Sequence, residues 1–145
     1  MLGRKLKIKQ LSNYTPAYAH TGDAGLDLRT TEDITLRAGQ HKTVGTGIAV
    51  EIPDGCVGLL FPRSGLACKH GVALRNCVGV IDSGYRGEIK VTLTCSEEKI
   101  TLAAGERVCQ LVVMLMFLAR LNAPMSLQIQ NVEQMAMAAR GRNSF

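Results

Sequence analysis

Short runs of alternating apolar and polar residues, separated by turn signals, recur from residue 6 to residue 113 of this 145-residue chain. A period of two places apolar side chains on one face of an extended strand, whereas a helix needs a period near 3.6. Turn-forming residues interrupt the runs, as in the Pro-Asp-Gly sequence at 53–55. The pattern predicts an all-β sandwich or barrel in a single domain. The expected strands cover residues 6–11, 34–36, 43–52, 57–61, 78–81, 89–93 and 108–113.

Lys5, Lys7 and Lys9 alternate with Leu6 and Ile8 near the N-terminus. This alternation predicts a half-buried edge strand with a solvated basic face. The formal net charge of +5 fits a polyanion or a phosphate-bearing small molecule equally well. The positive residues are scattered, however, and the aromatic residues that could stack on bases are only three Tyr and three Phe. We therefore expect a small-molecule ligand and no nucleic acid.

The segment 119–145 is interpreted as a C-terminal arm that follows a β domain of residues 1–118. Residues 127–130 alternate as a strand does, whereas residues 133–140 have the Ala, Met and Gln content of a helix. The path of the arm stays open at this point. The apolar run 111–118 is too short to span a bilayer and predicts a buried strand, so no membrane association is expected.

The five cysteines are an odd number without C-x-x-C spacing, so neither a disulfide framework nor a zinc site is indicated. The three histidines, at positions 20, 41 and 70, show no metal-ligand spacing and are expected to be surface or structural residues. We expect the thiols to be small buried groups in a reducing compartment. No apolar stretch long enough for a signal peptide follows the basic N-terminus. These features predict a cytoplasmic or nuclear protein that is not secreted.

One carboxylate and one aromatic ring occur together in the glycine-bracketed segment 79–87, GVIDSGYRG. Apolar residues lead into this segment and strict alternation follows it, which predicts a β-hairpin with Asp82 and Tyr85 at its tip. Glycines would let a flat ligand approach backbone groups that lack ladder partners. The same residues also fit an ordinary hairpin in which Asp82 makes an Asx-turn and Tyr85 packs on the sheet.

The segment 79–87 resembles the third motif of the trimeric dUTPase family, and the other family motifs have counterparts in the expected order. The resemblance is strong over roughly residues 20–113 and weaker elsewhere. It implies a distorted jelly-roll β-barrel that assembles as a homotrimer. In such a trimer, one chain supplies motifs one, two and four of a site, a second supplies motif three, and a third supplies motif five. The counterparts are 24–29 (AGLDLR), 62–67 (PRSGLA), 105–110 (GERVCQ), and Arg140-Gly141 with Phe145 as a partial fifth motif.

The same resemblance implies Mg²⁺-dependent hydrolysis of dUTP to dUMP and pyrophosphate, which limits uracil in DNA and supplies dUMP for dTTP synthesis. Asp82 would deprotonate a water for attack on the α-phosphorus, and Tyr85 would leave no room for a ribose 2′-hydroxyl. Asp27 would contact, through water, a Mg²⁺ that the triphosphate largely coordinates. The other implied substrate-binding residues are Asn76 and Gly79 for uracil, Arg63, Ser64, Gly65 and Gln110 for phosphates, Arg140 for the γ-phosphate, and Phe145 as a lid over the base.

The sequence departs from the family pattern at two places. Gly84 stands where the family most often has a second Asp, which predicts a looser hairpin with intact chemistry. Asn143 and Ser144 stand where the fifth motif has glycines, whose backbone N–H groups can approach phosphates. This second departure predicts either a weaker lid or a chain that continues past residue 145.

Two other functions stay open. A dCTP deaminase-type relative shares this barrel and would release ammonia from dCTP, although the combination of Asn76, Asp82 and Tyr85 favours a dUTPase. A regulatory protein that binds dUTP with weak catalysis would fit the incomplete fifth motif. The charged residues that we expect in structural or interface ion pairs are Arg86, Glu106 and Arg107.

Overall fold

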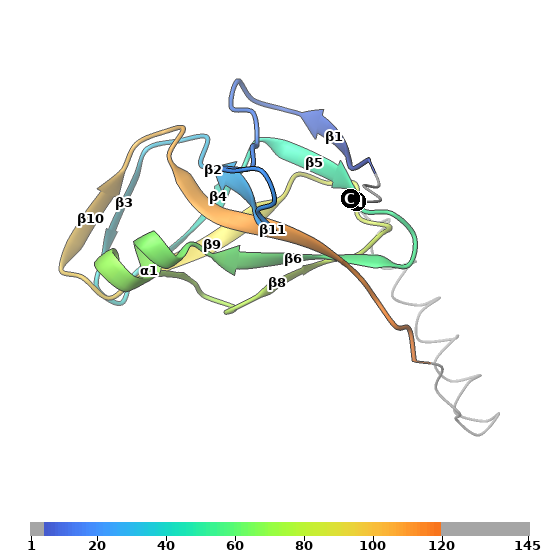
Figure 1. The fold of residues 1–145 in the computed structure, drawn as a ribbon. Coiled ribbons are helices and arrows are strands. Elements are labelled where there is room, and N and C mark those ends of the chain that lie inside the picture. The colour runs from blue at the N-terminus through green and yellow to red at the C-terminus, as the bar shows by residue number, and fades with distance from the viewer. Residues whose placement is uncertain (1–4, 120–145) are drawn as a thin grey trace, which may run out of the picture.

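Eleven strands and one short helix are the regular elements of the described part of the chain, residues 5–119, in the computed structural model (Figure 1). The alternating pattern of the sequence accounts for this, and the all-β prediction is confirmed. The elements are β1 (Lys7–Gln10), β2 (Leu26–Arg29), β3 (Ile34–Arg37), β4 (His41–Gly45), β5 (Ile48–Glu51), β6 (Cys56–Pro62), α1 (Ser64–His70), β7 (Val72–Leu74), β8 (Gly79–Ile81), β9 (Lys90–Cys95), β10 (Lys99–Leu102) and β11 (Arg107–Leu115).

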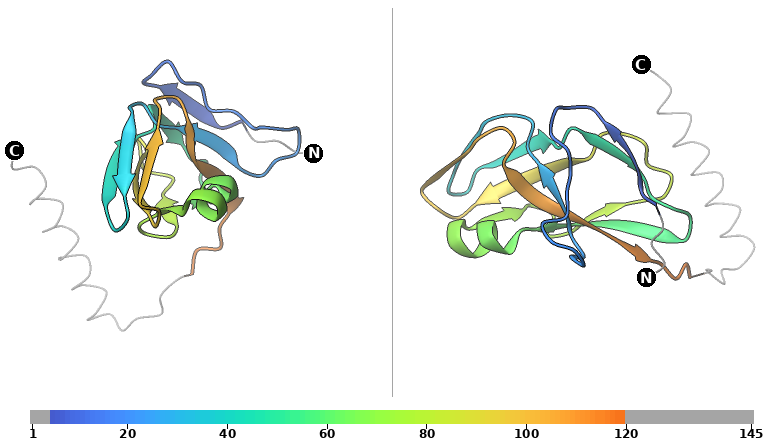
Figure 2. Two further views of the ribbon diagram at one scale, coloured as in Figure 1. Left: turned by 90° about the vertical axis from the view of Figure 1, so that its left-hand side faces the viewer. Right: turned by 45° about the horizontal axis from the view of Figure 1, so that its top comes forward.

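The strands pair antiparallel throughout residues 5–119 and form four sheets there. One sheet has the strand order β2-β11-β6-β8 and another has the order β4-β9-β7, while β1 pairs with β5 and β10 pairs with β3. Figure 1 and the right-hand view of Figure 2 show β3 and β10 at the same end of the molecule as α1, with β11 running toward the opposite end. This order places strands from distant parts of the sequence beside one another.

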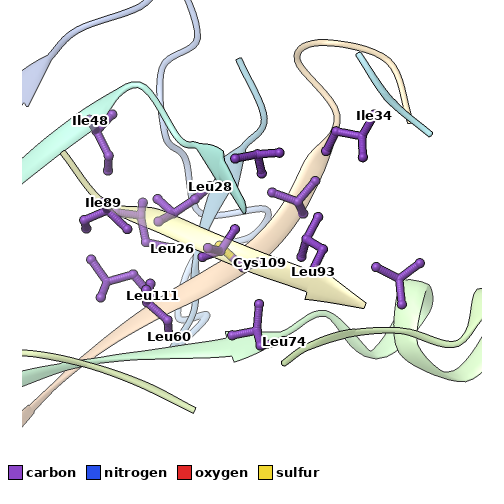
Figure 3. Close-up of a cluster of buried hydrophobic side chains, with 14 of the residues drawn as sticks. Leu26, Leu28, Ile34, Ile48, Leu60, Leu74, Ile89, Leu93, Cys109 and Leu111 are labelled. Atoms are coloured by element: carbon purple, nitrogen blue, oxygen red, sulfur yellow. The ribbon is translucent and has the colours of Figure 1, made fainter. Parts of the chain in front are cut away.

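Alternate side chains of the two larger sheets meet in one hydrophobic core (Figure 3). Leu60 of β6 is 2% exposed and Leu93 of β9 is fully buried, while their sequence neighbours along each strand are partly exposed. Burying a leucine side chain of this kind stabilises the fold by about 2 kcal/mol. The core therefore fixes which face of each strand points inward.

The predicted hairpin of residues 78–93 is wrong. β8 pairs with β6 at the edge of the four-stranded sheet, whereas β9 pairs with β4 and β7 in the other sheet. A period of two identifies strands but says nothing about their partners, because each partner is chosen by long-range packing. The segment between β8 and β9 is thus a loop that crosses between sheets, and it carries Asp82 and Tyr85.

Two further elements differ from the sequence-based expectation. The strand predicted at 43–52 is split into β4 and β5, because the backbone turns at Gly47 with a φ of 68° that favours glycine. The helix α1 was not expected; it ends at Gly71, whose φ of 58° makes the left-handed helix cap. Among the described residues, no helix is long and apolar enough to cross a membrane.

Both ends of the described chain are more exposed than predicted. β1 lies at an edge as expected, but all four of its residues are exposed, so the half-buried strand is a wrong prediction. The buried strand predicted at 111–118 is wrong for its second half: Leu115 is 77% and Phe117 96% exposed. The reason is that β6 begins at Cys56, the partner of Leu115, so strand pairing with β11 ends there.

The cysteines are all free thiols, as the sequence indicated. Their burial was predicted correctly for three of the five positions only. The buried thiols are Cys56, Cys95 and Cys109, and the exposed thiols are Cys68 and Cys77.

Candidate functional site

A pocket of about 370 Å³ brings together residues from three separate segments of the sequence. Asp27 comes from β2, Arg63 precedes α1, and Gln110 comes from β11. The sheet order explains this convergence, because β11 lies between β2 and β6, and Gln110 is in register with Asp27. We call this the Arg63 pocket; its lining residues are Ala19, His20, Asp23, Ala24, Gly25, Asp27, Arg63, Ser64 and Gln110.

Two guanidinium groups hold the buried carboxylate of Asp27. Arg63 Nε donates to Asp27 Oδ1 at 2.8 Å, and Arg107 Nη1 donates to Asp27 Oδ2 at 3.1 Å. The Asp27 side chain is only 10% exposed, so these charge-assisted bonds compensate for its removal from water. The bond to Asp27 uses the Nε of Arg63, which leaves the terminal amino groups of the fork for an anion in the pocket. Asp27 thereby orients Arg63, and the ion pair expected for Arg107 is confirmed.

The wall of the Arg63 pocket is closely packed around Gln110. The Gln110 Nε2 donates to the carbonyl of Pro62 at 3.0 Å. A Cβ at Gly25 would collide with the Gln110 Oε1, so only a glycine at position 25 leaves space for this amide. His20 and Asp23 are pocket residues that the sequence motifs did not predict. The His20 backbone N–H donates to Asp23 Oδ2 at 2.8 Å, and both residues line the pocket. Their position just before segment 24–29 was the only sequence signal.

A second pocket, of about 500 Å³, lies beside β8. Gly79 is buried there, and a Cβ on it would come within 3.1 Å of Leu60, so the backbone approaches closely. Asn76 precedes Cys77, which has a φ of 64°, a conformation that non-glycine residues seldom adopt. Asp82 is exposed and follows the last residue of β8. We call this the Asn76 pocket; its lining residues are Leu60, Leu74, Arg75, Asn76, Gly79, Val80, Ile81, Lys90, Val91 and Thr92.

The loop after Asp82 is folded back on itself. The Tyr85 hydroxyl donates to the Glu88 carbonyl at 2.8 Å, and the Tyr85 backbone N–H donates to the Asp82 carbonyl at 3.1 Å. The ring covers Gly87, where a Cβ would lie 2.6 Å from the Tyr85 hydroxyl oxygen. At Gly84 a Cβ would meet no atom within 4 Å, so the place of the family's second Asp is open space. Tyr85 is thus held on the loop, with 43% of its surface exposed.

Within the chain, Arg86 and Glu106 make hydrogen bonds to the backbone. Arg86 Nη1 donates to the Ser83 carbonyl at 2.6 Å, and Glu106 Oε1 accepts from the Ala103 backbone N–H at 2.8 Å. In both contacts the two residues are three positions apart, so each hydrogen bond closes a tight turn. A side chain can form such a local bond more readily than a pair with a distant charge.

The structure does not bring all the expected site residues together within one chain. The Arg63 pocket contains Asp27, Arg63, Ser64 and Gln110, whereas Asn76 and Gly79 line the Asn76 pocket, and the two pockets share no lining residue. Gly65 follows Ser64 in α1, and a Cβ there would meet no atom within 4 Å. The two residues expected from the arm, Arg140 and Phe145, lie outside the described residues.

The residues of the Arg63 pocket fit Mg²⁺ only as an ion that keeps its own waters and binds a phosphate. Residues 5–119 contain no group of three or more His, Cys, Asp or Glu side chains that could hold a metal ion by themselves. Both oxygens of Asp27 already accept from guanidinium groups, which leaves its remaining lone pairs for a water. Mg²⁺ commonly binds in this way, through one or two carboxylates and the phosphates of a substrate.

The thiol of Cys109 lies in the core next to this pocket (Figure 3) and takes no part in polar chemistry. The pKa of Cys109 is raised from 9.0 to about 12, mainly by burial and also by the Asp27 carboxylate, while the Arg63 guanidinium acts in the opposite direction. Because only the thiolate is a good nucleophile, Cys109 is excluded as a nucleophile near neutral pH.

The fold and the site define an antiparallel β protein with a pocket in which a guanidinium, a hydroxyl and an amide meet, and these groups can donate to the oxygens of an anionic, phosphate-bearing ligand. A family profile described as dUTPase matches residues 13–145. The chain belongs to the dUTPase family.

Named relatives and solved structures agree with this assignment. The chain is 45% identical over 132 residues to the deoxyuridine 5′-triphosphate nucleotidohydrolase of Corynebacterium jeikeium, covering 90% of this chain and 82% of the relative. It is 44% identical over 131 residues to the enzyme of the same name from Nocardia farcinica, covering 89% of this chain and 76% of the relative.

Among solved structures, the fold matches a mutant dUTPase of Staphylococcus bacteriophage 80alpha with dUpNHpp, with a TM-score of 0.77 and 25% identity over 85% of this chain and 97% of that chain. It also matches a mutant dUTPase from phage phi11 of S. aureus, which coordinates a structural Mg(II) ion, with a TM-score of 0.75. That match covers 84% of this chain and 97% of the phage protein at 24% identity, and it supports the fold alone.

Proposed function

We propose that this chain hydrolyses dUTP to dUMP and pyrophosphate. The observation that carries the proposal is the Arg63 pocket, in which the buried Asp27 carboxylate orients a guanidinium fork beside Ser64 and Gln110. Such a fork matches the geometry of phosphate oxygens, and preorganised donors stabilise the charge that develops in phosphoryl transfer. Membership of the dUTPase family and relatives named deoxyuridine 5′-triphosphate nucleotidohydrolase support dUTP as the substrate.

In the proposed mechanism, the Arg63 pocket binds the triphosphate. Arg63 acts as a fork donor and Ser64 as a hydroxyl donor near the scissile bridge, while Gln110 donates to a phosphate oxygen. Gly65 leaves the backbone open beside these groups, because no atom lies near the place of its missing side chain. Mg²⁺ would neutralise phosphate charge, held by the triphosphate itself and by Asp27 through a water.

The Asn76 pocket would bind the deoxyuridine. Asn76 would pair with the edge of uracil, and the backbone at Gly79, which lines the same pocket, would lie close to the base. A closely fitted pocket rejects thymine by a clash with its methyl group and cytosine by mismatched donors. Asp82, exposed just after β8, would orient and deprotonate the attacking water.

We propose that the working unit is a homotrimer of jelly-roll barrels with shared sites. Two observations support sharing: the two pockets have no common lining residue, and the end of β11 exposes apolar side chains that a neighbouring chain could cover. Residues 1–118 would form the barrel, and residues 119–145 an arm that carries Arg140 to the γ-phosphate and Phe145 over the uracil. A site would then combine the Arg63 pocket of one chain with the Asn76 pocket of another.

Replacing Tyr85 with alanine is expected to raise the UTP to dUTP ratio of kcat/KM by about tenfold or more, because the ring would no longer exclude a ribose 2′-hydroxyl. The kcat/KM for each substrate, measured from pyrophosphate release, checks this result. Ser96→Ala, at an exposed position away from both pockets, is the control. An unchanged ratio in the Tyr85→Ala protein would remove Tyr85 from sugar recognition.

Pyrophosphate release from dUTP, dTTP, dCTP and UTP, each measured with Mg²⁺ and with a chelator, tests the proposed function. We expect release from dUTP alone and only with Mg²⁺. Ammonia release from dCTP would instead identify a deaminase, and tight dUTP binding without pyrophosphate release would identify a regulatory dUTP-binding protein. Equal activity in chelator would contradict the role of the metal.

A further inference from the structure

The carboxylate of Glu88 occupies the space left by the missing side chain of Gly45. A Cβ at Gly45 would collide with Glu88 Oε1 and would lie 3.1 Å from Cδ and 3.4 Å from Oε2. In this position Glu88 Oε1 accepts a hydrogen bond from the backbone N–H of Gly47 at 3.0 Å. Glu88 therefore ties the loop between β8 and β9 to the turn between β4 and β5.

Glu88 lies between Ile89, whose backbone is hydrogen-bonded on both sides, and the loop that carries Asp82 and Tyr85. The Ile89 N–H donates to Ile48 at 2.8 Å, and the Ile89 carbonyl accepts from both the N–H and the hydroxyl of Thr46, at 3.0 and 2.7 Å. On the other side of Glu88, the bonds of Tyr85 and Arg86 stay within the segment 82–88. Glu88 is thus the last residue of the loop with a side-chain bond to the β4–β5 turn.

Tyr85 depends on Glu88 for its position. Its hydroxyl donates to the Glu88 carbonyl at 2.8 Å, and its ring lies over Gly87, where a Cβ would come within 2.9 Å of Cζ. The position of the ring is therefore set by two features: the place of the Glu88 backbone and the absence of a side chain at Gly87. The Glu88 carboxylate contributes to the first of these features through its hydrogen bond from the Gly47 N–H.

We propose that Glu88 is a positioning residue for sugar specificity. It acts through two hydrogen bonds: its carboxylate accepts from the Gly47 N–H, and its carbonyl accepts from the Tyr85 hydroxyl. This inference rests on the proposed role of Tyr85 against the deoxyribose. Gly45 is part of the same arrangement, because only a glycine at this position leaves space for the Glu88 carboxylate. When the Glu88 hydrogen bonds are disturbed, the Tyr85 ring moves and leaves space for a ribose 2′-hydroxyl. The positions of Asp82 and of the residues in the Arg63 pocket do not change.

Two substitutions disturb the position of the Glu88 carboxylate in different ways. Glu88→Ala removes the acceptor of the Gly47 N–H, and Gly45→Ala fills the space that the carboxylate needs. The φ of Gly45 is not positive, so alanine fits the β4 backbone there, and the group that must move is the end of a flexible side chain. For each variant we expect the UTP to dUTP ratio of kcat/KM to rise about fivefold, the size of one lost hydrogen bond.

The controls separate positioning from general destabilisation. Glu88→Gln keeps an Oε1 acceptor and should restore the wild-type ratio, whereas Glu98→Ala removes an exposed carboxylate elsewhere and should not change it. The double variant Gly45→Ala/Glu88→Ala should show about the same ratio as either single variant, because both remove one interaction. Melting temperatures of all variants verify that the ratios are measured on folded protein.

The outcomes distinguish this inference from the proposed function. If Tyr85→Ala raises the ratio but folded Glu88→Ala and Gly45→Ala proteins keep the wild-type ratio, the positioning role of Glu88 is wrong and the role of Tyr85 stands. If Tyr85→Ala itself leaves the ratio unchanged, the proposed role of Tyr85 fails first. Failure of Glu88→Gln to restore the ratio would also overturn the inference.

Discussion

The Asp82→Ala protein should bind a non-hydrolysable dUTP analogue with nearly wild-type affinity and lose about a thousandfold in kcat, as expected when a general base is removed. Asp82 is exposed after β8, so its side chain supports the fold little and its removal should leave the structure intact. Single-turnover pyrophosphate release gives the chemical step, and titration with dUpNHpp gives the affinity.

Asp54→Ala is the matched control for this experiment. Asp54 is also an exposed aspartate in a turn, next to Gly55, but it precedes β6 and lies outside the loop between β8 and β9 that carries Asp82. It should keep full turnover. Wild-type kcat in the Asp82→Ala protein would exclude Asp82 as the base, whereas loss of analogue binding together with turnover would assign it a binding role.

Mixing two inactive variants should restore activity if the sites are shared between chains. Ser64→Ala is expected to disable the Arg63 pocket and Asp82→Ala the loop beside the Asn76 pocket, so each homogeneous assembly should be inactive. In a trimer that contains both variants, about one site in three would combine an intact pocket from each variant. Co-expression with different affinity tags, purification through both tags and a pyrophosphate assay measure this recovery.

The result is decisive in either direction, because both variants carry small substitutions at exposed positions. Recovery to about a third of the wild-type rate per site is expected for trimers that carry both tags. Doubly tagged assemblies that stay as inactive as their parents would show that each site lies within one chain, and the proposed sharing would be abandoned. A mixture of separately assembled variants, kept from exchanging chains, is the control.

Local pattern predicted the strands better than it predicted their arrangement. The segments at 57–61 and 108–113 were expected as strands and form parts of β6 and β11, because alternation reports which face of a strand is buried. Helix α1 escaped prediction since its seven residues are too few for a helical period to appear. The prediction of a hairpin was wrong because a loop between two sheets and a hairpin between paired strands have the same local sequence signals.

The same division applies to the candidate site. Arg63, Ser64 and Gln110 could be named from motif order, yet the ion pairs of Asp27 that orient the guanidinium depend on β2 and β11 being neighbours. The contact between Gly45 and Glu88 likewise joins residues from separate sheet-forming segments, and nothing in either segment indicates it.

The sequence by itself therefore determined the all-β class, the family and the identity of the chemical groups, since each of these depends on residue type and spacing along the chain. The tertiary structure alone decided which strands pair and that Asp27 lies between two arginines. It also decided that Arg63, Ser64 and Gln110 line one pocket with Asp27, while Asn76 and Gly79 line another. Those features arise from contacts between residues far apart in sequence, whose geometry is set when the two larger sheets pack on a common core.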